Sequence, residues 1–434
     1  MFPRYGKMFV KLTCAAIILM TYRDCVNTDP FPNLSDDPSD SEMLKTYKID
    51  PGNPAKTSAT WVTHLCPKYS HHTLPKHASL HWEKPGHGAI FFTQTSCSIT
   101  LSPREACAVE SAARHHPGRP VLVFMTAPSV DASQPLLKLV QQLDTVSLRW
   151  LDLDRVFASG PLEPWHRDRM WMLSEDRAPA TVSDAVRAEM LRHFGGTYVD
   201  LDAITLRAFP RSPNWLGRVD QRLVTAAVSS FQRDHPLLKA AVAALPASYD
   251  PSACCSVGPD LLTDLLHQQC PDNITIPTSA PPEAAEYCGD VVVQPRTLFY
   301  PIHYGYEIDE LESIFRDGEG LGPAFFSHTK TKDAFSLHLF HSLSRKRLVS
   351  LRGDSILKEA ARRNCPKVYR YLLSQKDCFG RIERLRKLVN IGVSNRDGLC
   401  NKHRKRKAIS FETRAVIACS TEDQGQIQEQ FERY

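Results

Sequence analysis

The sequence of 434 residues lacks several features that would assign it to common classes of protein. It has no Cys-x-x-Cys pair among its 13 cysteines, and the adjacent Cys254 and Cys255 cannot both bind one zinc ion comfortably, so a clustered zinc site is disfavoured. It has no internal repeat. It also lacks a run of about 20 apolar residues, the length that crosses a bilayer. Because 42% of its residues are apolar and 23% are charged, wholesale disorder is excluded as well.

A basic field over the whole protein is absent too. The formal net charge is +5, but the whole surplus lies in residues 371–434, and the first 370 residues are neutral. This distribution disfavours a nucleic-acid partner. Within the tail, Lys402–Lys407 resembles a nuclear localisation or nucleic-acid patch; in a lumenal protein we interpret it as a solvated charge run or a proteolysis site.

The cysteines and the N-terminus both point to an oxidising compartment. Dispersed cysteines at this density favour several disulfides with one cysteine left over, the alternative being buried free thiols. Near the N-terminus, basic residues precede the short apolar run Leu12–Tyr22. This pattern predicts a short type II signal anchor or a cleaved signal peptide, the alternative being an ordinary core helix. Sequons at Asn33 and Asn273 agree with lumenal exposure.

The chain continues with a polar stretch and then an alternating strand and helix pattern. Residues 24–60 are rich in Asp, Pro, Ser, Asn and Thr, which predicts a solvated stem. Buried strands are expected at 89–93 and 121–125, and between them a helix that Ser102 caps and that stops before Pro117. Such a βαβ unit predicts a parallel sheet, whose ligands bind beyond the carboxyl ends of its strands. Thr93–Cys97 and Thr126 are therefore expected near a site.

The most informative stretch is residues 181–209. Thr181 or Ser183 is expected to cap a helix that ends at Gly195-Gly196, with Asp184 and Arg187 on one face of its first turn. The alternative for this pair is an ordinary surface ion pair.

An Asp-x-Asp follows the two glycines. If the segment is extended, alternation places Tyr198, Asp200 and Asp202 on one side. Two such carboxylates can hold Mg²⁺ or Mn²⁺, with a substrate diphosphate completing the shell. A second copy, Asp152-Leu153-Asp154, lacks the glycines and the Asp/Arg pair, so we expect a solvated turn or helix start there.

Taken together, seven motifs resemble, in order, the family of α1,4-glycosyltransferases that includes lactosylceramide 4-α-galactosyltransferase and α1,4-N-acetylglucosaminyltransferase. They are Ile90–Ser96, Cys107–Ala113, Ser183–Arg187, Gly195–Asp202, Gly258–Thr263, Phe299–Ile302 and Cys365–Tyr369. The resemblance covers roughly residues 86–370.

The resemblance implies an α/β fold of the GT-A type, with a Rossmann-like nucleotide-binding half and an acceptor half. It implies a type II Golgi membrane enzyme with a lumenal catalytic domain. The expected organisation is a cytoplasmic stub and signal anchor in 1–25, a stem in 26–85, a catalytic domain in 86–370 and a basic tail in 371–434.

The implied reaction is retaining α1,4 transfer from a UDP-sugar (galactose, N-acetylgalactosamine or N-acetylglucosamine) to a glycolipid or glycan. Mn²⁺, or Mg²⁺, is expected at Asp200 and Asp202. Asp184 and Arg187 are expected to contact the nucleotide-sugar, with a phosphate or sugar oxygen on the guanidinium.

Three further residues are expected to line the donor site. Thr93 stands at the end of the first strand, Tyr198 borders the nucleotide pocket unless it only packs, and His338 reaches the diphosphate or metal unless it is a structural histidine. The resemblance also implies a disulfide between Cys270 and Cys288, and a bridge from Cys365 to an unidentified partner.

The sequence departs from relatives at Thr225-Ala226-Ala227, at His338–His341 and at Asp260, where donor and acceptor should be recognised. These departures keep a second reading open, a UDP-sugar-binding homologue without activity. A third reading is a haloacid dehalogenase-type phosphatase with Asp200 as nucleophile. It needs a buried strand running into that residue and a paired acidic motif downstream, and neither is evident.

Overall fold

The computed structural model describes residues 60–66 and 77–375, apart from 159, 275–282, 305–309, 330, 348 and 352. Contacts within the chain divide it into two units, residues 37–369 on one side and 1–36 with 370–434 on the other. The predicted signal anchor, Asn33 and the basic run at 402–407 lie outside the described residues. No described helix is long and apolar enough to cross a membrane.

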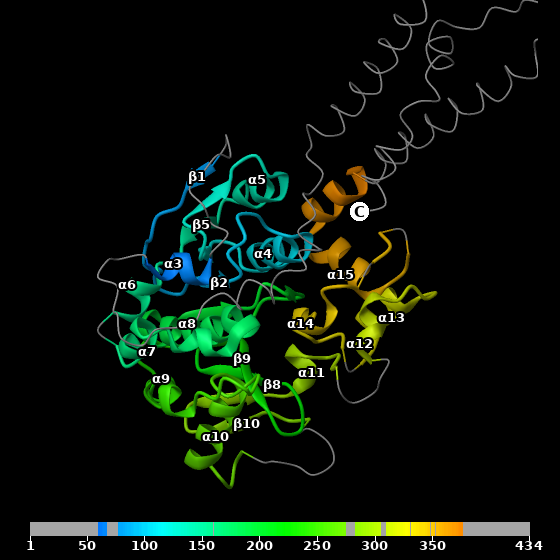
Figure 1. Cartoon of the computed structure of the whole chain (residues 1–434). Helices are drawn as coiled ribbons and strands as arrows, with labels where there is room; N and C mark the ends of the chain where they lie inside the picture. Colours follow the sequence, from blue (N-terminus) through cyan, green and yellow to red (C-terminus); the bar gives the residue numbers. More distant parts are fainter. Residues whose placement is uncertain are drawn as a thin grey trace, which may run out of the picture. The chain divides into compact units, whose positions relative to one another are not determined.

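An eight-stranded mixed sheet forms the centre of the fold (Figure 1). Its order is β10-β11-β8-β9-β6-β2-β3-β5. The strands span β2 Ile90–Gln94, β3 Val121–Met125, β5 Val146–Trp150, β6 Gly196–Val199, β8 Trp215–Arg218, β9 Val224–Phe231, β10 Glu286–Cys288 and β11 Val291–Gln294. β5, β3, β2 and β6 run parallel, whereas β9 is antiparallel to both β6 and β8. The sheet thus has a parallel, Rossmann-like half and a mixed half, which confirms the expected α/β class.

Helices cover both faces of the sheet. They span α3 Thr60–Leu65, α4 Pro103–His115, α5 Pro135–Gln141, α6 Leu153–Phe157, α7 Glu163–Arg167, α8 Ala178–Phe194, α9 Pro236–Ser248, α10 Pro259–Gln269, α11 Arg296–Phe299, α12 Glu310–Phe315, α13 Leu321–Ser327, α14 His341–Ser344 and α15 Ile356–Asn364. α4 packs on β3 and α5 on β5, while α8 packs on β2, β6 and β9. Crossovers between parallel strands are right-handed, and the strand order reverses between β5 and β6. This places α8 on the face of the sheet opposite to α4 and α5.

The predicted βαβ unit is confirmed as β2-α4-β3, with Ile90 opposite Val121 in parallel register. Ser102 caps α4 as expected. Its hydroxyl accepts from the Glu105 N–H at 3.3 Å, and the Glu105 carboxylate accepts from the Ser102 N–H at 2.7 Å. This capping box satisfies two backbone donors that the helix leaves unpaired and stabilises it by about 1 kcal/mol. The helix ends at His115, before Pro117.

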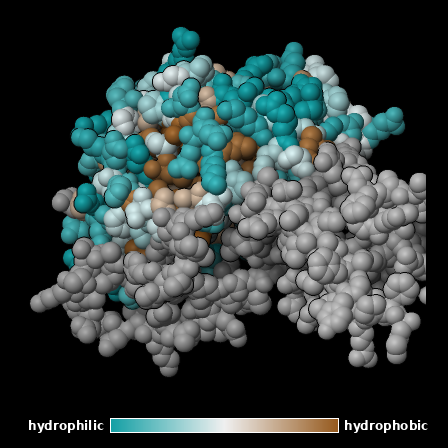
Figure 2. All heavy atoms as spheres, turned by 90° about the horizontal axis from the view of Figure 1, so that it is seen from above, coloured by the Kyte–Doolittle hydropathy of each residue, from teal (hydrophilic) through white to brown (hydrophobic). Residues whose placement is uncertain are grey.

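Aromatic and aliphatic side chains fill the space between the helices and the sheet. An apolar cluster joins residues of α3 and α6–α10 to the strands, with Trp171 and Val186 fully buried. Seen from above, the described surface is mostly hydrophilic, with apolar side chains gathered near the middle of the described part (Figure 2). Burial of this kind is the main term that favours folding.

The folded region begins before residue 86, where we placed the end of the stem. Trp61 on α3 is 2% exposed and stacks on Trp150 of β5, with ring centroids 6.4 Å apart. Cys66 forms a disulfide with Cys97. The short strand β1, His77–Ser79, pairs with β4, Ser129–Asp131. A tryptophan and a cysteine in an otherwise polar stretch were the available signals.

All eight cysteines that the structure describes are paired. The bridge between Cys270 and Cys288 is confirmed, and Cys365 has Cys107 of α4 as its partner. The adjacent Cys254 and Cys255 also pair. Four disulfides in the described part of the chain favour an oxidising compartment over the alternative of buried free thiols.

Two short strands far apart in the sequence form a separate sheet. β7, Ala203–Thr205, pairs antiparallel with β12, Ser336–His338, and the register sets His338 opposite Ala203. The pairing brings the C-terminal part of the described chain to the end of β6, directly after Asp202.

The buried imidazole of His116, at the end of α4, predicts a loss of stability in acid. Its Nδ1 donates to the Ala112 carbonyl and its Nε2 accepts from the Phe209 N–H, both at 2.9 Å, so the folded state needs the neutral ring. Burial lowers its pKa to about 4, below an unfolded value of about 6.5. Its contribution is therefore complete above about pH 6.5 and is lost as the pH falls towards 4.

We expect His116 to account for about 2 kcal/mol of lost unfolding free energy between about pH 6.5 and 4.5. Urea titrations at several pH values measure this loss. His116→Gln, which does not titrate, should be less stable at neutral pH but show a shallower acid slope than the wild type. Equal slopes for the two proteins would contradict the assignment.

Candidate functional site

Two carboxylates lie in the turn that follows the central strand β6. The strand ends at Val199, and the turn is fixed by the Asp200 N–H, which donates to the Ala227 carbonyl at 2.8 Å, and by the Ala203 N–H, which donates to the Asp200 carbonyl at 3.0 Å. The condition that the segment is extended through residue 202 is therefore not met. The turn, and not strand alternation, brings Asp200 and Asp202 together at the carboxyl end of the parallel strands.

The two glycines before β6 are required by the backbone. Gly195 and Gly196 have φ values of +66° and +105°, and a Cβ on Gly196 would lie 2.6 Å from the Ala89 carbonyl oxygen. Only glycine adopts these conformations without strain. The predicted end of the helix at Gly195-Gly196 is confirmed, and the pair allows β6 to enter the sheet beside β2.

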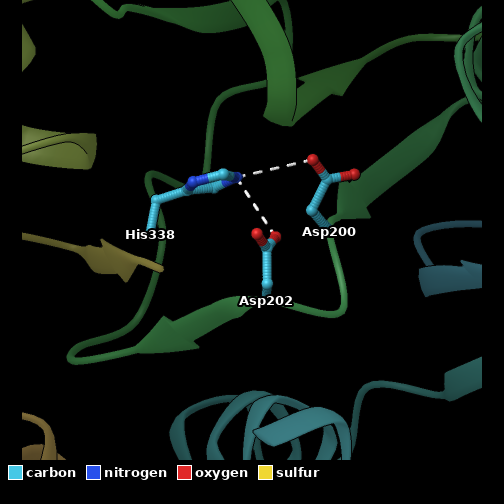
Figure 3. A group of neighbouring side chains, drawn as sticks. All are labelled: Asp200, Asp202 and His338. Carbon is cyan, nitrogen blue, oxygen red and sulfur yellow. Dashed lines mark ion pairs between the residues drawn. The ribbon is translucent and has the colours of Figure 1, made fainter. Parts of the chain in front are cut away.

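His338 completes a three-residue cluster with these carboxylates (Figure 3). Its Nε2 lies 3.2 Å from Asp202 Oδ1 and 3.5 Å from Asp200 Oδ2. One donor atom from each residue falls within 4.8 Å of the others. Asp202 is held from its other side, because the His341 N–H donates to its Oδ2 at 2.6 Å.

The cluster fits a divalent cation. Nε2 of His338 is buried and forms no hydrogen bond of good geometry, although it faces two carboxylates. Burial lowers the pKa of His338, but Asp202 and Asp200 outweigh it, and the net pKa is raised. Negative charge is thus concentrated at one point, where the two carboxylates can bind a hard cation through oxygen.

Arg187 joins the cluster to α8. Its Nη2 lies 2.9 Å from Asp200 Oδ1 and 3.1 Å from Asp184 Oδ1, and its guanidinium lies over the ring of Tyr198, 4.6 Å from the centroid. Burial raises the pKa of Asp184 to about 6 although Arg187 opposes this. Burial also raises the pKa of Asp200, but Arg187 and His338 outweigh it and the net pKa is lowered. The pair we weighed as a surface ion pair is therefore largely enclosed, since the side chains of Arg187 and Asp184 are 9% and 16% exposed.

The start of α8 differs from the prediction. The helix begins at Ala178, with Arg177 at its N-cap, and not at Thr181 or Ser183. A 3₁₀ helix, Met170–Arg177, leads directly into it, and Pro179 occupies one of its first two positions. Asp184 and Arg187 therefore share a face in the second and third turns and not in the first.

Two family models match consecutive parts of the chain. Residues 102–221 match the "glycosyltransferase sugar-binding region containing DXD motif", and residues 230–372 match the "alpha 1,4-glycosyltransferase conserved region". Together they contain every residue of the cluster and its arginine.

The chain belongs to the α1,4-glycosyltransferase family.

Curated relatives agree with this assignment. Lactosylceramide 4-alpha-galactosyltransferase of Mus musculus is 28% identical over 65% of this chain and 76% of its own, and that of Homo sapiens is 29% identical over 69% and 80%. Alpha-1,4-N-acetylglucosaminyltransferase of Homo sapiens is 26% identical over 65% and 80%. Among solved structures, the PaToxG glycosyltransferase aligns with 43% of this chain and 71% of its own, at 15% identity and a TM-score of 0.35. As a family member the protein is a hexosyltransferase.

In this α1,4-glycosyltransferase, Thr93 and Tyr198 support the site from within. The Tyr198 hydroxyl lies 3.0 Å from Thr93 Oγ1 and 3.2 Å from Ser183 Oγ, and both predicted residues are buried. Burial raises the pKa of Tyr198 beyond its ordinary value. The Tyr198 side chain is thus neutral and hydrogen-bonded, and its ring supports the Arg187 guanidinium through a cation–π contact.

Sequence reasoning missed two contacts of this α1,4-glycosyltransferase site. The bond between Arg187 and Asp200 links two motifs that local patterns treat separately. Gly258, before α10, approaches so closely that a Cβ there would lie 2.8 Å from Asp184 Oδ2. The Gly-Pro pair at 258–259 was the signal for such a close approach.

The fold also bears on the second Asp-x-Asp and on the phosphatase alternative. Asp152 of the second Asp-x-Asp is the N-cap of α6, so a helix start is confirmed, but Asp152 is buried and not solvated. The strand β6 does run into Asp200, so strand length does not exclude a phosphatase. The family match excludes a phosphatase, because it assigns the Asp-x-Asp to a sugar-binding region.

Proposed function

We propose that this protein is a retaining glycosyltransferase of the Golgi lumen. It moves a hexose or N-acetylhexosamine from a UDP-sugar to a galactose- or hexosamine-terminated acceptor in α1,4 linkage, with a glycosphingolipid as the principal acceptor. The observation that carries the proposal is the cluster of Asp200, Asp202 and His338 beside Arg187. The names of the relatives support the linkage and the acceptor class.

We further propose Mn²⁺ as the cation, held by Asp200 and Asp202. When bound, it offsets the negative charge that develops on the departing diphosphate. His338 has a separate role: the Phe340 N–H donates to its Nδ1 at 3.2 Å, so the neutral ring carries its proton on Nε2. That Nε2–H lies beside the carboxylates and is suited to donate to a diphosphate oxygen.

The remaining residues orient the reactants. Arg187 fixes the carboxylate of Asp200 and holds Asp184, whose oxygens accept from sugar hydroxyls. No motif supplies an enzyme nucleophile. Transfer therefore takes place on one face of the sugar: the bond from the anomeric carbon to the diphosphate breaks, the acceptor hydroxyl bonds to that carbon, and its proton passes to the leaving phosphate. The contribution of the protein is positioning and electrostatics.

A lumenal location is part of the proposal. The four disulfides support it, and so does Asn273, which is exposed in the turn after α10. Residues 1–25 would anchor the protein in the membrane. Protease protection of intact Golgi vesicles, with and without detergent, tests this: cleavage of the catalytic part without detergent would place it on the cytosolic side.

The decisive test is a donor screen with the purified lumenal part. UDP-galactose, UDP-N-acetylgalactosamine and UDP-N-acetylglucosamine are each supplied with lactosylceramide or a glycoprotein, with Mn²⁺, Mg²⁺ or EDTA. We expect one donor to be transferred with Mn²⁺, and proton NMR of the product to show an α-anomer linked to O4. If no UDP-sugar were transferred or hydrolysed, the protein would be a donor-binding homologue without activity.

A further inference from the structure

Two aromatic rings lead from the cluster of Asp200, Asp202 and His338 towards solvent. We call this pair the aromatic step, and it consists of Phe340 and Tyr304. The ring of Phe340 lies 4.6 Å from that of His338, and the ring of Tyr304 lies 5.0 Å from Phe340, edge to face. Tyr304 is therefore only two ring contacts from the histidine of the donor site.

The backbone of Phe340 is held in a strained conformation. Its φ and ψ are +49° and +62°, the left-handed region that a bulky residue rarely enters. Two bonds hold it there: its own N–H donates to His338 Nδ1, and the next N–H, of His341, donates to Asp202. Strain of this kind, tied directly to the cluster, points to a functional placement of the ring.

The two rings of the step differ in exposure. Phe340 is buried, whereas Tyr304 is 43% exposed. The buried ring of His303 stacks on Tyr304, with centroids 4.2 Å apart and planes at 29°. Tyr304 thus presents aromatic surface to solvent on a rigid support, which favours binding because little side-chain entropy is lost.

Charged groups lie near Tyr304. The carboxylates of Asp220 and Asp260 act on Tyr304, whose pKa is raised by burial and by these two charges. Arg222 lies 3.4 Å from Asp260; the arginine side chain is exposed and the aspartate side chain is partly exposed. A rim of both charge signs does not suit a lipid chain. It suits a ligand with an apolar face and several hydroxyl groups, which is the chemistry of a pyranose.

We propose that Tyr304, supported by Phe340 and His303, is the subsite for the terminal galactose of the acceptor. This rests on the proposed α1,4 transfer, in which O4 of the acceptor reacts. In galactose the hydrogens at C3, C4 and C5 form one continuous apolar face, and the axial O4 points away from it. A galactose stacked on Tyr304 therefore keeps O4 free for the donor. Glucose, with its axial hydrogen at C4 on the opposite side, offers no such face.

Saturation-transfer NMR with methyl β-D-galactopyranoside tests the subsite without requiring turnover. The full lumenal part is used with UDP and Mn²⁺. We expect saturation of H3, H4 and H5 in the wild type and in Tyr304→Phe, and a Kd about tenfold weaker in Tyr304→Ala, as for the loss of one ring contact. Tyr287→Ala is the matched control, since Tyr287 is also exposed, at 59%, but lies on β10.

Three outcomes would contradict the assignment of Tyr304 to the acceptor subsite. Unchanged affinity in Tyr304→Ala, absence of galactoside binding to the wild type, or equal binding of methyl β-D-glucopyranoside would overturn the subsite. UDP release from the donor without acceptor is followed in parallel and should be equal in the wild type and in Tyr287→Ala. If the wild type released no UDP from any donor while the galactoside still bound at Tyr304, the proposed function would fail and the subsite would stand.

Discussion

Changing Asp202 to asparagine is expected to lower the rate of sugar transfer by about a thousandfold. The substitution keeps the size of the side chain and its acceptor for the His341 N–H, but it removes one of the two negative charges on which a divalent cation depends. Mn²⁺ affinity, measured by calorimetry in the presence of UDP, should fall in parallel. Thermal unfolding should change little, because Asp202 forms no part of the core.

The chain supplies a matched control in its second Asp-x-Asp. Asp154 lies 2.9 Å from His166 and is partly exposed, far from the cluster in the sequence. Asp154→Asn should keep transfer within about twofold of the wild type, since it alters only a partly exposed hydrogen bond. Full activity in Asp202→Asn, or an equal loss in Asp154→Asn, would remove Asp202 from the site.

Replacing Arg187 with methionine is expected to cost about 4 kcal/mol of stability as well as activity. Methionine fills much of the same space but leaves the partly buried carboxylates of Asp184 and Asp200 close together and without their cation. Chemical denaturation followed by circular dichroism measures the loss. Mn²⁺ should restore part of it, because the metal would supply positive charge at Asp200.

Two further variants separate charge from position. Arg187→Lys keeps the charge but cannot bridge both carboxylates with one planar group, so it should recover more stability than activity. Arg207→Met breaks an exposed pair with Asp333 and should cost at most about 0.5 kcal/mol. If Arg187→Met were as stable as Arg207→Met, the buried network would not contribute as we describe.

Local patterns in the sequence predict much of this site. The apolar runs at 89–93 and 121–125, the capping box at Ser102 and the two glycines before β6 each have a short-range physical cause, and each is found in the structure. Because β6 is a central parallel strand, the position of the Asp-x-Asp at its carboxyl end follows from the same reasoning.

Contacts between distant segments were not predictable in this way. The register that sets His338 opposite Ala203 depends on how two three-residue strands meet, and strands this short carry too little pattern to specify it. The disulfide partner of Cys365 was not predictable either, since disulfide connectivity cannot be deduced from the spacing of cysteines. The start of α8 was misplaced because good N-cap residues at 181 and 183 lie inside a helix that continues from a 3₁₀ turn.

The pairing of β7 with β12 also determines when the site forms as the protein is made. The parallel strands and the Asp-x-Asp are complete once residue 231 has been synthesised, but the third member of the cluster arrives more than a hundred residues later. An emerging chain therefore passes through an interval in which Asp202 lacks its contacts with His338 and with the His341 N–H. Domains whose contacts are distant in sequence fold slowly and expose surface meanwhile. A ribosome stalled within that interval should hold a chain that chaperones still recognise.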